Sequence, residues 1–445
     1  MNPARRFLLL ASLVAATGGL LHGAPAPQQP VPDQLDLKTS VGFAIENNFA
    51  IRQARERIRQ QDGVLIEVSA RRAPSVVAAG SVQGNSDSLS QSFPASDRSW
   101  NLSLTATQNL YSGGAVRSGV AGARLGREAA LLDLKSVIQD SIVNVRVAFF
   151  RVLLAGEKIK VQEQNVNLLQ QELKNASDRF DAGTASAFEK TRAEVALANA
   201  RVPLITANNE RRLAIESLRQ QLGFTTTSTP ENLRKIPTFV GALEYRATDI
   251  DLSTALQTAR ARRPELQRLG KLVEAGGAAV ESAQAARKPS LDLVGGWQLR
   301  KGSTNSFGDS ENGTYLGLQS RWNVFDGRAT TARISQARSG LEQSRLRLTE
   351  AELGVEVQVR SAHSALQEAR ELAEASQKVV ELAQEALRLA NVRNDAGTAT
   401  QLDVLQSNVD LTTARTNQVQ AYYAFNVALA ELRAAMGLPD EFIAE

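Results

Sequence analysis

Side chains that could catalyse a reaction or hold a metal ion are scarce in this chain of 445 residues. Cysteine is absent, which excludes disulfides, thiol catalysis, thiolate metal sites and a lipid-anchored N-terminal cysteine. Of the two histidines, His22 lies in a candidate leader, so His363 alone would remain in the mature chain. A Ser-His-Asp triad would depend on that one residue, and no Gly-x-Ser-x-Gly elbow is present. We therefore expect no enzyme, no cofactor and no metal ion.

Two carboxylates occupy equivalent positions in the sequence. Glu189 and Asp403 each lie six residues after a glycine, Gly183 or Gly397, and they are 403 − 189 = 214 residues apart. Carboxylates gathered around one axis would attract cations and repel anions. An acidic residue near a helix start is also favoured by the helix dipole, so a solvated helix face explains the same pattern. The spacing alone leaves both interpretations open.

The two glycines belong to a heptapeptide that the chain contains twice. Arg-Phe-Asp-Ala-Gly-Thr-Ala occupies 179–185 and returns at 393–399 with Asn394 in place of Phe. Both copies separate long runs rich in Ala, Leu, Glu and Arg, so each is predicted to be the turn of an antiparallel helical hairpin. The glycine would supply the left-handed backbone that ends the first helix. One copy would indicate only a hairpin, but two copies in register indicate a tandem duplication.

The elements that would position these turns follow the same order in both copies. The first copy is predicted to contain a helix over 39–72, strands over 75–84 and 99–110, and helices over 115–180 and 186–222. The second is predicted to contain a helix over 251–287, strands over 291–300 and 315–322, and helices over 329–394 and 400–436. Pro74 and Pro289 end the first helix of each copy, and Pro203 is expected to kink its helix. Residues 224–250 join the copies.

The predicted strands alternate apolar and polar residues. One face of the second strand carries Trp100, Leu102, Leu104 and Ala106, and the other carries Asn101, Ser103, Thr105 and Thr107. Such strands, joined by polar loops at 85–98 and 301–313, fit membrane β-hairpins whose loops face outward. A soluble hairpin half-buried on a core fits the pattern equally well. All three tryptophans are predicted to lie in strands, where bilayer interfaces would favour them.

The N-terminus resembles a secretory signal over residues 1–24, with Arg5-Arg6 before an apolar run and a small-residue exit at 22–24. That run is too short for a spanning helix, and no later stretch reaches about 20 uncharged apolar residues. With 51 basic and 47 acidic side chains and few aromatic ones, the chain shows no nucleic-acid-binding pattern. We expect an exported protein.

The duplicated plan restricts the geometry. A helix of about 66 residues would measure about 100 Å and would pack with the shorter helices as a coiled coil. Four strands per chain cannot close a barrel, and lipid does not tolerate open sheet edges. If the strands span a membrane, two chains would give eight strands and a filled lumen, whereas three would give twelve and could leave a passage.

The duplicated plan, the proline before each hairpin and the Arg-x-x-x-Gly-Thr-x-Ser/Thr turns resemble the TolC-like outer-membrane efflux protein family over residues 37–438. The resemblance implies an α+β fold with a long antiparallel coiled-coil α-barrel and a 12-stranded transmembrane β-barrel shared by a homotrimer. It suggests a signal peptide (1–24), an N-terminal tail (25–36), a first repeat (37–224), an equatorial linker (225–250), a second repeat (251–438) and a C-terminal tail (439–445). Because it lacks cysteine, the chain resembles the unlipidated branch of the family.

The same resemblance implies a passive exit duct in the outer membrane, with its helical barrel in the periplasm, for a tripartite efflux pump or a type I secretion system. Expected partners are a periplasmic adaptor (membrane fusion) protein, an inner-membrane pump and outer-membrane lipid. The adaptor would dock at the turns, where small side chains allow close approach but also simply permit a tight turn. These residues are Gly183, Thr184, Ala185, Ser186, Gly397, Thr398, Ala399 and Thr400.

In the resembling family, acidic residues at the turns line a narrow periplasmic entrance, so the pore constriction is expected at Glu189, Asp403 and Gln406. Gln406 stands where the best-known member has a second acid, and Asn394 and Ala399 stand where it has a Tyr and an Arg that lock the closed state. These differences predict a weaker lock and a less acidic ring. The competing function is structural: a periplasmic coiled-coil spacer or adaptor with soluble hairpins.

Overall fold

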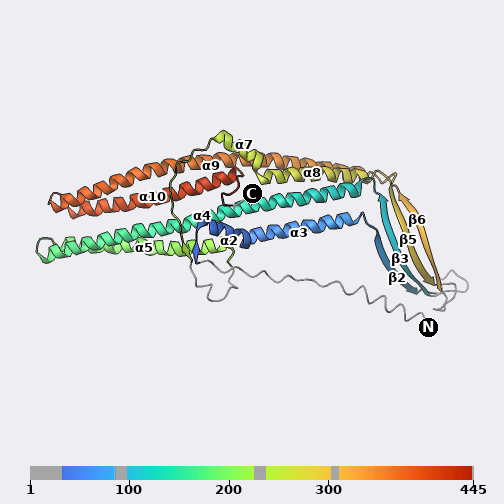
Figure 1. Cartoon of the computed structure of the whole chain (residues 1–445), viewed down its shortest axis with the longest axis horizontal. Coiled ribbons are helices and arrows are strands. Elements are labelled where there is room, and N and C mark those ends of the chain that lie inside the picture. Colours follow the sequence, from blue (N-terminus) through green and yellow to red (C-terminus); the bar gives the residue numbers. More distant parts are fainter. Residues whose placement is uncertain (1–32, 85, 87–97, 225–236, 302–309, 443–445) are drawn as a thin grey trace. The chain divides into compact units, whose positions relative to one another are not determined.

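The computed structural model describes residues 33–84, 86, 98–224, 237–301 and 310–442, and it divides into two units (Figure 1). The small unit comprises residues 1–35 and 225–238. Its strand β1 (Gln34–Leu35) pairs with β4 (Thr238–Phe239), of which Thr238 is the last residue of this unit, and the Thr238 N–H donates to the Asp33 carbonyl (2.9 Å). The predicted signal peptide, nearly all of the first predicted loop and most of the second lie outside the described residues. All that follows concerns the large unit, residues 36–224 and 239–445.

The large unit contains the same six elements twice. The first set is α2 (Leu37–Asn47), α3 (Phe49–Ala70), β2 (Ser75–Gly84), β3 (Arg98–Tyr111), α4 (Ala115–Asp181) and α5 (Ala187–Leu222). The second set is α7 (Leu252–Arg262), α8 (Pro264–Ala285), β5 (Ser290–Lys301), β6 (Ser310–Arg321), α9 (Ala329–Asp395) and α10 (Gln401–Ala435). This order confirms the tandem repeat, and both long helices end within about one residue of their predicted bounds.

The prediction of one helix over 39–72 is wrong, because the chain leaves the helical conformation at Asn48 (φ −59°, ψ 131°). The Asn48 side-chain oxygen accepts a hydrogen bond from the Ala50 N–H (2.8 Å) and thereby caps α3. Its amide nitrogen donates to the Gln221 carbonyl near the end of α5 (2.7 Å). Gly223 fits against this break so closely that a Cβ on it would lie 2.4 Å from the Asn47 carbonyl oxygen. The break lets α3 and α5 follow one another along α4.

The prediction of one helix over 251–287 is wrong at the equivalent position, Arg263 (263 − 48 = 215), where φ is −59° and ψ is 116°. Pro264 takes the first position of α8, where its missing N–H removes no helical hydrogen bond. The buried Arg263 guanidinium donates to the Ala435 carbonyl at the end of α10 (2.9 Å) and to the Gln358 side chain. Burial lowers the Arg263 pKa. The two repeats therefore bend at the same point by means of different side chains.

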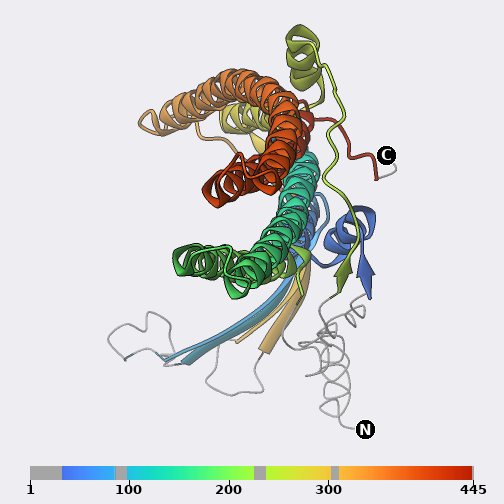
Figure 2. The same cartoon turned by 90° about the vertical axis from the view of Figure 1, so that its left-hand side faces the viewer.

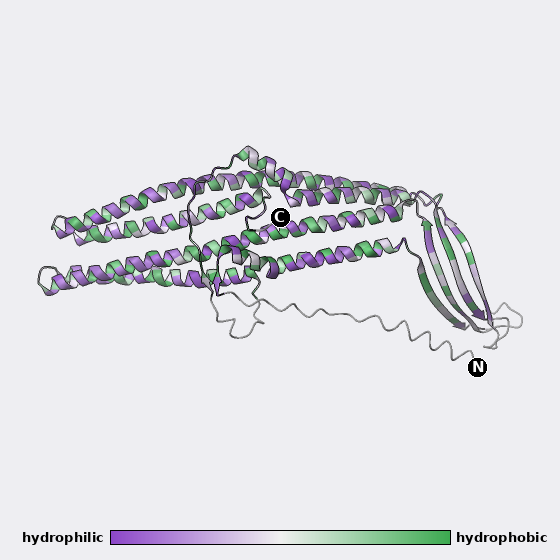
Figure 3. Ribbon diagram, viewed as in Figure 1, coloured by the Kyte–Doolittle hydropathy of each residue, from purple (hydrophilic) through white to green (hydrophobic). Residues whose placement is uncertain are grey.

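Helices α3, α4, α5, α8, α9 and α10 form a single curved layer, and the short helices α2 and α7 lie outside it (Figure 2). Near the turns the order is α5, α4, α10 and α9, and near the sheet it is α3, α4, α8 and α9. Apolar residues hold the repeats together: Leu405 of α10 packs with Val166 and Leu169 of α4 and Leu197 of α5. Hydrophilic residues interrupt every helix (Figure 3), and among the described residues none is apolar enough over a sufficient length to cross a bilayer.

The sheet has the order β2-β3-β5-β6, with every pair antiparallel, so the two repeats join at β3 and β5 (Figure 1). The register aligns the apolar residues of all four strands, since Ala78 faces Leu104, Leu104 faces Trp297 and Gly295 faces Leu316. One face is therefore apolar and the other polar, as predicted. Two details differ from the prediction: β6 begins at Ser310, and Trp322 lies one residue beyond its end.

Residues 239–250 run in an extended conformation across α4, α10 and α9. Phe239 packs edge-on against Phe149 of α4 (6.3 Å between ring centroids), and the Tyr245 hydroxyl donates to Glu374 of α9 (2.7 Å). His363 Nε2 forms a hydrogen bond with the Ile250 carbonyl (2.9 Å). His363, the single histidine of the predicted mature chain, thus holds this segment on α9 and has a structural role.

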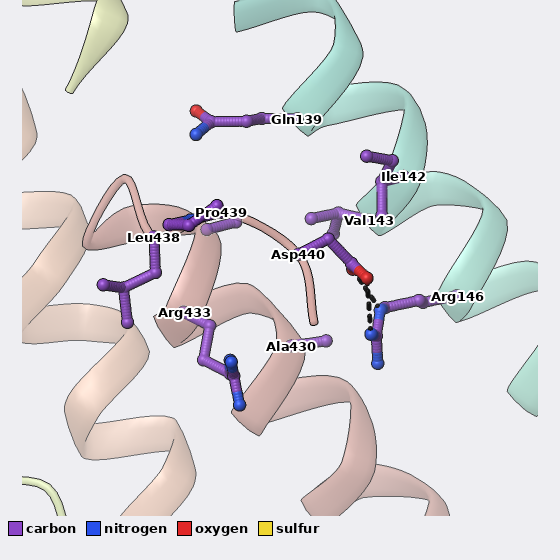
Figure 4. A pocket seen from close by; sticks show the side chains of 10 residues that line it. Gln139, Ile142, Val143, Arg146, Ala430, Arg433, Leu438, Pro439 and Asp440 are labelled. Carbon is purple, nitrogen blue, oxygen red and sulfur yellow. Dashed lines mark hydrogen bonds and ion pairs between the residues drawn. The ribbon is translucent and has the colours of Figure 1, made fainter. Parts of the chain in front are cut away.

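The segment after α10 turns back onto α4 (Figure 4). Arg146 donates from Nε and Nη2 to the two oxygens of Asp440 (2.8 and 3.0 Å), and the side chains are only 16% and 9% exposed. The Arg146 guanidinium also lies over the Phe442 ring, 5.1 Å from its centroid. Because Arg146 belongs to the first repeat and Asp440 follows the second, this pair ties the two repeats together.

Candidate functional site at the hairpin turns

The two turns have the same backbone geometry. Gly183 and Gly397 adopt left-handed conformations (φ 75° and 71°), in which a residue with a Cβ would be strained. In each turn, the threonine that follows the glycine donates from its N–H and its hydroxyl to the carbonyl of the arginine that begins the heptapeptide. The distances are 2.8 and 3.0 Å in the first turn and 2.8 and 3.1 Å in the second. The repeated sequence therefore encodes a fixed turn.

The first residues of the returning helices differ between the repeats. Ser186 caps α5 by accepting a hydrogen bond from the Glu189 N–H (3.3 Å). The Glu189 carboxylate also accepts from the Ser186 hydroxyl (3.4 Å). Thr400 caps α10 in the same way, and here the Asp403 carboxylate accepts from both the Thr400 N–H and its hydroxyl (both 2.8 Å), which completes a capping box. These bonds, the backbone one foremost, lower the Asp403 pKa. Asp403 is thus an exposed carboxylate that stays charged and is held on its own helix start.

Glu189 instead contributes to a cleft of about 520 Å³ between the two hairpins. The cleft draws residues from α4 and α5 of one hairpin and from α9 and α10 of the other. Its lining residues are Glu172, Asn175, Ala176, Asp178, Arg179, Glu189, Asn391, Asn394, Asp395 and Gln401. The lining contains four carboxylates, one guanidinium and several amides, so the cleft is acidic and rich in hydrogen-bond acceptors. The Gln401 Oε1 atom is buried and accepts no hydrogen bond from the described residues.

Close to the turns, Arg179 connects the two hairpins. Its guanidinium donates to Asn394 Oδ1 (3.4 Å) and lies 3.9 Å from a carboxylate oxygen of Asp395. Both contacts are long, and Arg179 and Asp395 are 51% and 81% exposed, so the ion pair contributes only about 0–1 kcal/mol. Behind it, burial raises the pKa of Glu172; the negative charge of Asp395 adds to this effect and the positive charge of Arg179 opposes it. The link can therefore open at little cost.

A buried amide pair lies further from the turns. Asn408 of α10, which is 3% exposed, donates to Asn165 Oδ1 of α4 (2.7 Å). Asn165 is half-buried, and a polar pair of this kind in helix packing favours the register that satisfies it, because a shift would leave the buried Asn408 amide without its partner. This pair thus fixes how far α10 lies along α4, and with it the relative position of the two turns.

Of the site residues predicted from the sequence, some line the cleft and others do not. Glu189 lines the cleft, whereas Asp403 and Gln406 do not, and Gln406 instead donates to Asp410 (3.0 Å). Sequence reasoning missed Arg179 and Asp395 as members of the site. Both belong to the repeated heptapeptide, and an arginine of one copy beside an aspartate of the other was the available signal.

Together, these features define a class of protein. A sheet with one apolar face, one polar face and two unpaired edges continues into a curved layer of long helical hairpins, which is the design of a channel subunit. The family model for the outer membrane efflux protein matches residues 41–224 and 255–438. The chain belongs to the outer membrane efflux protein family.

Individual relatives agree with this assignment. The chain is 27% identical over 429 residues to Protein CyaE of Bordetella pertussis (93% of this chain and 88% of the relative). It is 26% identical over 434 residues to the outer membrane efflux protein BepC of Brucella suis (96% and 90%). The CmeC outer membrane channel of Campylobacter jejuni superposes with a TM-score of 0.77 at 16% identity, covering 90% of this chain and 85% of that structure.

These findings confirm the predicted family and the TolC-like channel fold. The protein is an outer-membrane exit duct whose helical part lies in the periplasm, and the family consists of channels rather than enzymes.

Proposed function

We propose that three copies of this chain form the outer-membrane duct of a tripartite export system, coupled to an inner-membrane transporter through a periplasmic adaptor. The observation that carries the proposal is that the sheet and the helical layer each end in two edges that no described element of the chain covers. β2 and β6 are the open edges of the sheet, and α5 and α9 are the outer helices of the layer near the turns. Open strand edges are not tolerated in lipid, so each must pair with another chain.

The outer helices carry apolar side chains that no other described element of the chain covers. On α5 the exposed residues are Phe188, Val195, Val202, Ile205 and Leu213, and on α9 they include Leu372, Val379, Leu382, Leu389 and Val392. Many are spaced by seven, or by three and four, which is the spacing of a coiled-coil seam. When one edge of a copy contacts the opposite edge of the next copy, the interface is heterologous, and a closed ring of copies leaves no edge uncovered. Three copies supply the twelve strands that can leave a passage.

The turns are the proposed adaptor-docking surface: Gly183, Thr184, Ala185, Ser186, Gly397, Thr398, Ala399 and Thr400. Their threonine hydroxyls already donate within the turn, so the surface they offer is small and of fixed shape. A helical hairpin of a partner can approach such a surface closely. The acidic cleft beside it offers carboxylate and amide acceptors to donors on the partner.

The proposed constriction comprises Glu189, Asp403 and Gln406. In a trimer, Asp403 would place three charged carboxylates near the axis, and Glu189 would add charge beside Arg179. Such a ring favours cations over anions. The family name supports efflux of small molecules; export of a polypeptide by a type I system uses the same parts, and the class of the captured transporter distinguishes the two.

A crosslinking experiment tests the coupling, and the absence of native cysteine allows single, specific labels. Thr184→Cys and Thr398→Cys, each carrying a short photo-crosslinker, should capture an adaptor in the periplasm of cells that express the whole system. Lys160→Cys on α4, far from both turns in the sequence, is the matched control and should capture much less. Trimers that form normally but yield no adaptor from either turn would contradict the docking proposal.

A further inference from the structure

The junction between the sheet and the helices is strongly basic. Four segments meet there, residues 71–75, 109–117, 286–292 and 321–330, and together they contain seven Arg or Lys and two Asp. All seven cations are exposed, and none forms an ion pair within the described part of the chain. They are Arg71, Arg72, Arg117, Arg287, Lys288, Arg321 and Arg328. Helix surfaces elsewhere in the protein mix both signs, so this excess is local.

The junction segments of the two repeats lie against one another. The Arg72 carbonyl accepts a hydrogen bond from the β3 side chain Gln108 (2.9 Å), and the Arg287 carbonyl accepts one from the Trp322 indole (3.1 Å). The turn after β3 touches the second repeat, because a Cβ on Gly113 would lie 2.9 Å from the Cβ of Lys288. The cations therefore share one end of the sheet, the end that adjoins the helices.

The two carboxylates do not neutralise this surface. Asp292 accepts a hydrogen bond from Asn109 (2.8 Å) and belongs to the polar face of the sheet, as does Arg321 by its strand position. Asp326 is held at the start of α9, where it accepts from the N–H (2.8 Å) and hydroxyl of Thr330. Without Asp292 and Arg321, which belong to the polar face, the junction carries six cations and one carboxylate, that of Asp326.

Exposed apolar side chains border the cations. Tyr111, the last residue of β3, and Phe325, four residues after β6, occupy equivalent positions of the two repeats (325 − 111 = 214) and are 47% and 86% exposed. Trp322 and Val324 between β6 and α9 are 59% and 78% exposed. Trp322 also continues the alternation of the apolar face beyond Leu316 and Leu318. Aromatic residues at this level of a membrane sheet belong to the girdle at the bilayer interface.

We propose that this junction surface binds the headgroups of anionic phospholipids in the periplasmic leaflet of the outer membrane. The junction surface consists of Arg71, Arg72, Arg117, Arg287, Lys288 and Arg328 with Tyr111, Trp322 and Phe325. The aromatic rings lie among the first acyl carbons, and the cations contact the phosphates just outside them. A zwitterionic headgroup would leave the excess positive charge unbalanced, so the surface selects a net anionic lipid such as phosphatidylglycerol. The inference requires only the outer-membrane location, and neither the adaptor nor the cargo enters it.

Trp322 provides a reporter inside the proposed site. A full-length Trp100→Phe/Trp297→Phe background leaves it as the single tryptophan. The protein is reconstituted in phosphatidylcholine vesicles that contain graded fractions of bromine-labelled phosphatidylglycerol or bromine-labelled phosphatidylcholine, and quenching of Trp322 gives the relative binding of the two lipids. We expect phosphatidylglycerol to bind at least about fivefold better, the factor that one cation beside an anionic surface supplies. The preference should fall sharply in about 0.5 M salt.

The matched variants remove four positive charges each. Arg71→Gln/Arg72→Gln/Arg287→Gln/Lys288→Gln should reduce the preference to about one, whereas Lys174→Gln/Arg201→Gln/Arg211→Gln/Lys378→Gln on the helices should leave it unchanged. Equal quenching by both lipids in the background protein, or an unchanged preference in the junction variant, overturns the proposal. Loss of the preference on adding inorganic phosphate at constant ionic strength would also overturn it, because it would indicate a free-anion site. If the junction variant does not assemble, the salt series decides: a salt-independent preference refutes the electrostatic selection.

Discussion

The Arg146–Asp440 pair allows a sharp test of how the two repeats are held together. Asp440→Asn keeps the shape of the side chain but removes its charge and replaces one of its two acceptors by a donor. The pair is nearly buried, and both oxygens accept from the guanidinium at 2.8 and 3.0 Å. Removing one partner of a buried pair costs about 3–5 kcal/mol, because the remaining charge stays desolvated. Since the Phe442 ring and one acceptor remain, we expect a loss of about 2–3 kcal/mol.

The measurement is chemical unfolding of the reconstituted protein, with comparison of midpoints at equal slope. Adding Arg146→Gln gives a double-mutant cycle, and the coupling free energy between the two positions should exceed about 1 kcal/mol. Glu342→Gln is the matched control, because its pair with Arg345 is about 60% exposed on both sides and should contribute less than about 0.5 kcal/mol. If Asp440→Asn costs no more than this control, the C-terminal segment does not hold the repeats together.

Three further outcomes concern the turns. Arg179→Ala should raise single-channel conductance by removing the link to Asn394, whereas Arg393→Ala, whose guanidinium donates to the Thr398 carbonyl of its own turn, should not; equal effects would refute the link. Asp403→Asn should reduce cation selectivity in planar bilayers. Because the Asp403 pKa is lowered, its charge is lost only as the pH falls through that lowered pKa, so wild-type selectivity should be the same at pH 7 and pH 5. Burial raises the Glu172 pKa. The ionised carboxylate therefore lowers the free energy of unfolding at pH values above that pKa, and this effect is absent in acid. Glu172→Gln should therefore not destabilise the protein at pH 7, and clear destabilisation there would show that the charge is needed.

The sequence was sufficient for the features that repeat. Two copies of the heptapeptide, the proline before each hairpin and strict alternation in the strands established the turns, the long helices and the two faces of the sheet, because each depends on local backbone preferences. The breaks at Asn48 and Arg263 were missed for a different reason. Asn48 caps α3 through a local bond, but its amide nitrogen also donates to the Gln221 carbonyl near the end of α5, and that contact is long-range. Pro264 was a local signal for the second break, and helical periodicity on both sides of it hid the boundary.

The candidate site was less predictable because its residues come from both hairpins. Position within the motif placed Glu189 and Asp403 equivalently, and their backbones are indeed equivalent, since each N–H donates to the helix-capping hydroxyl. What separates them is the set of partners of the carboxylate. The Asp403 carboxylate closes a capping box with the N–H and hydroxyl of Thr400, whereas the Glu189 carboxylate accepts from the Ser186 hydroxyl (3.4 Å) and Glu189 lines the cleft. Periodicity cannot show which side chain faces the neighbouring hairpin.

Duplication with divergence explains why the turns differ in chemistry but not in shape. The backbone bonds of the turn depend on the glycine and on the threonine after it, and both are the same in the two copies. Side chains outside that constraint were free to change: Phe180 in one copy is Asn394 in the other. Phe180 lies beneath the Lys190 ammonium within its own hairpin (5.4 Å), whereas Asn394 accepts from Arg179 of the other hairpin. One substitution within the repeated motif thus converts a contact inside a hairpin into a contact between hairpins.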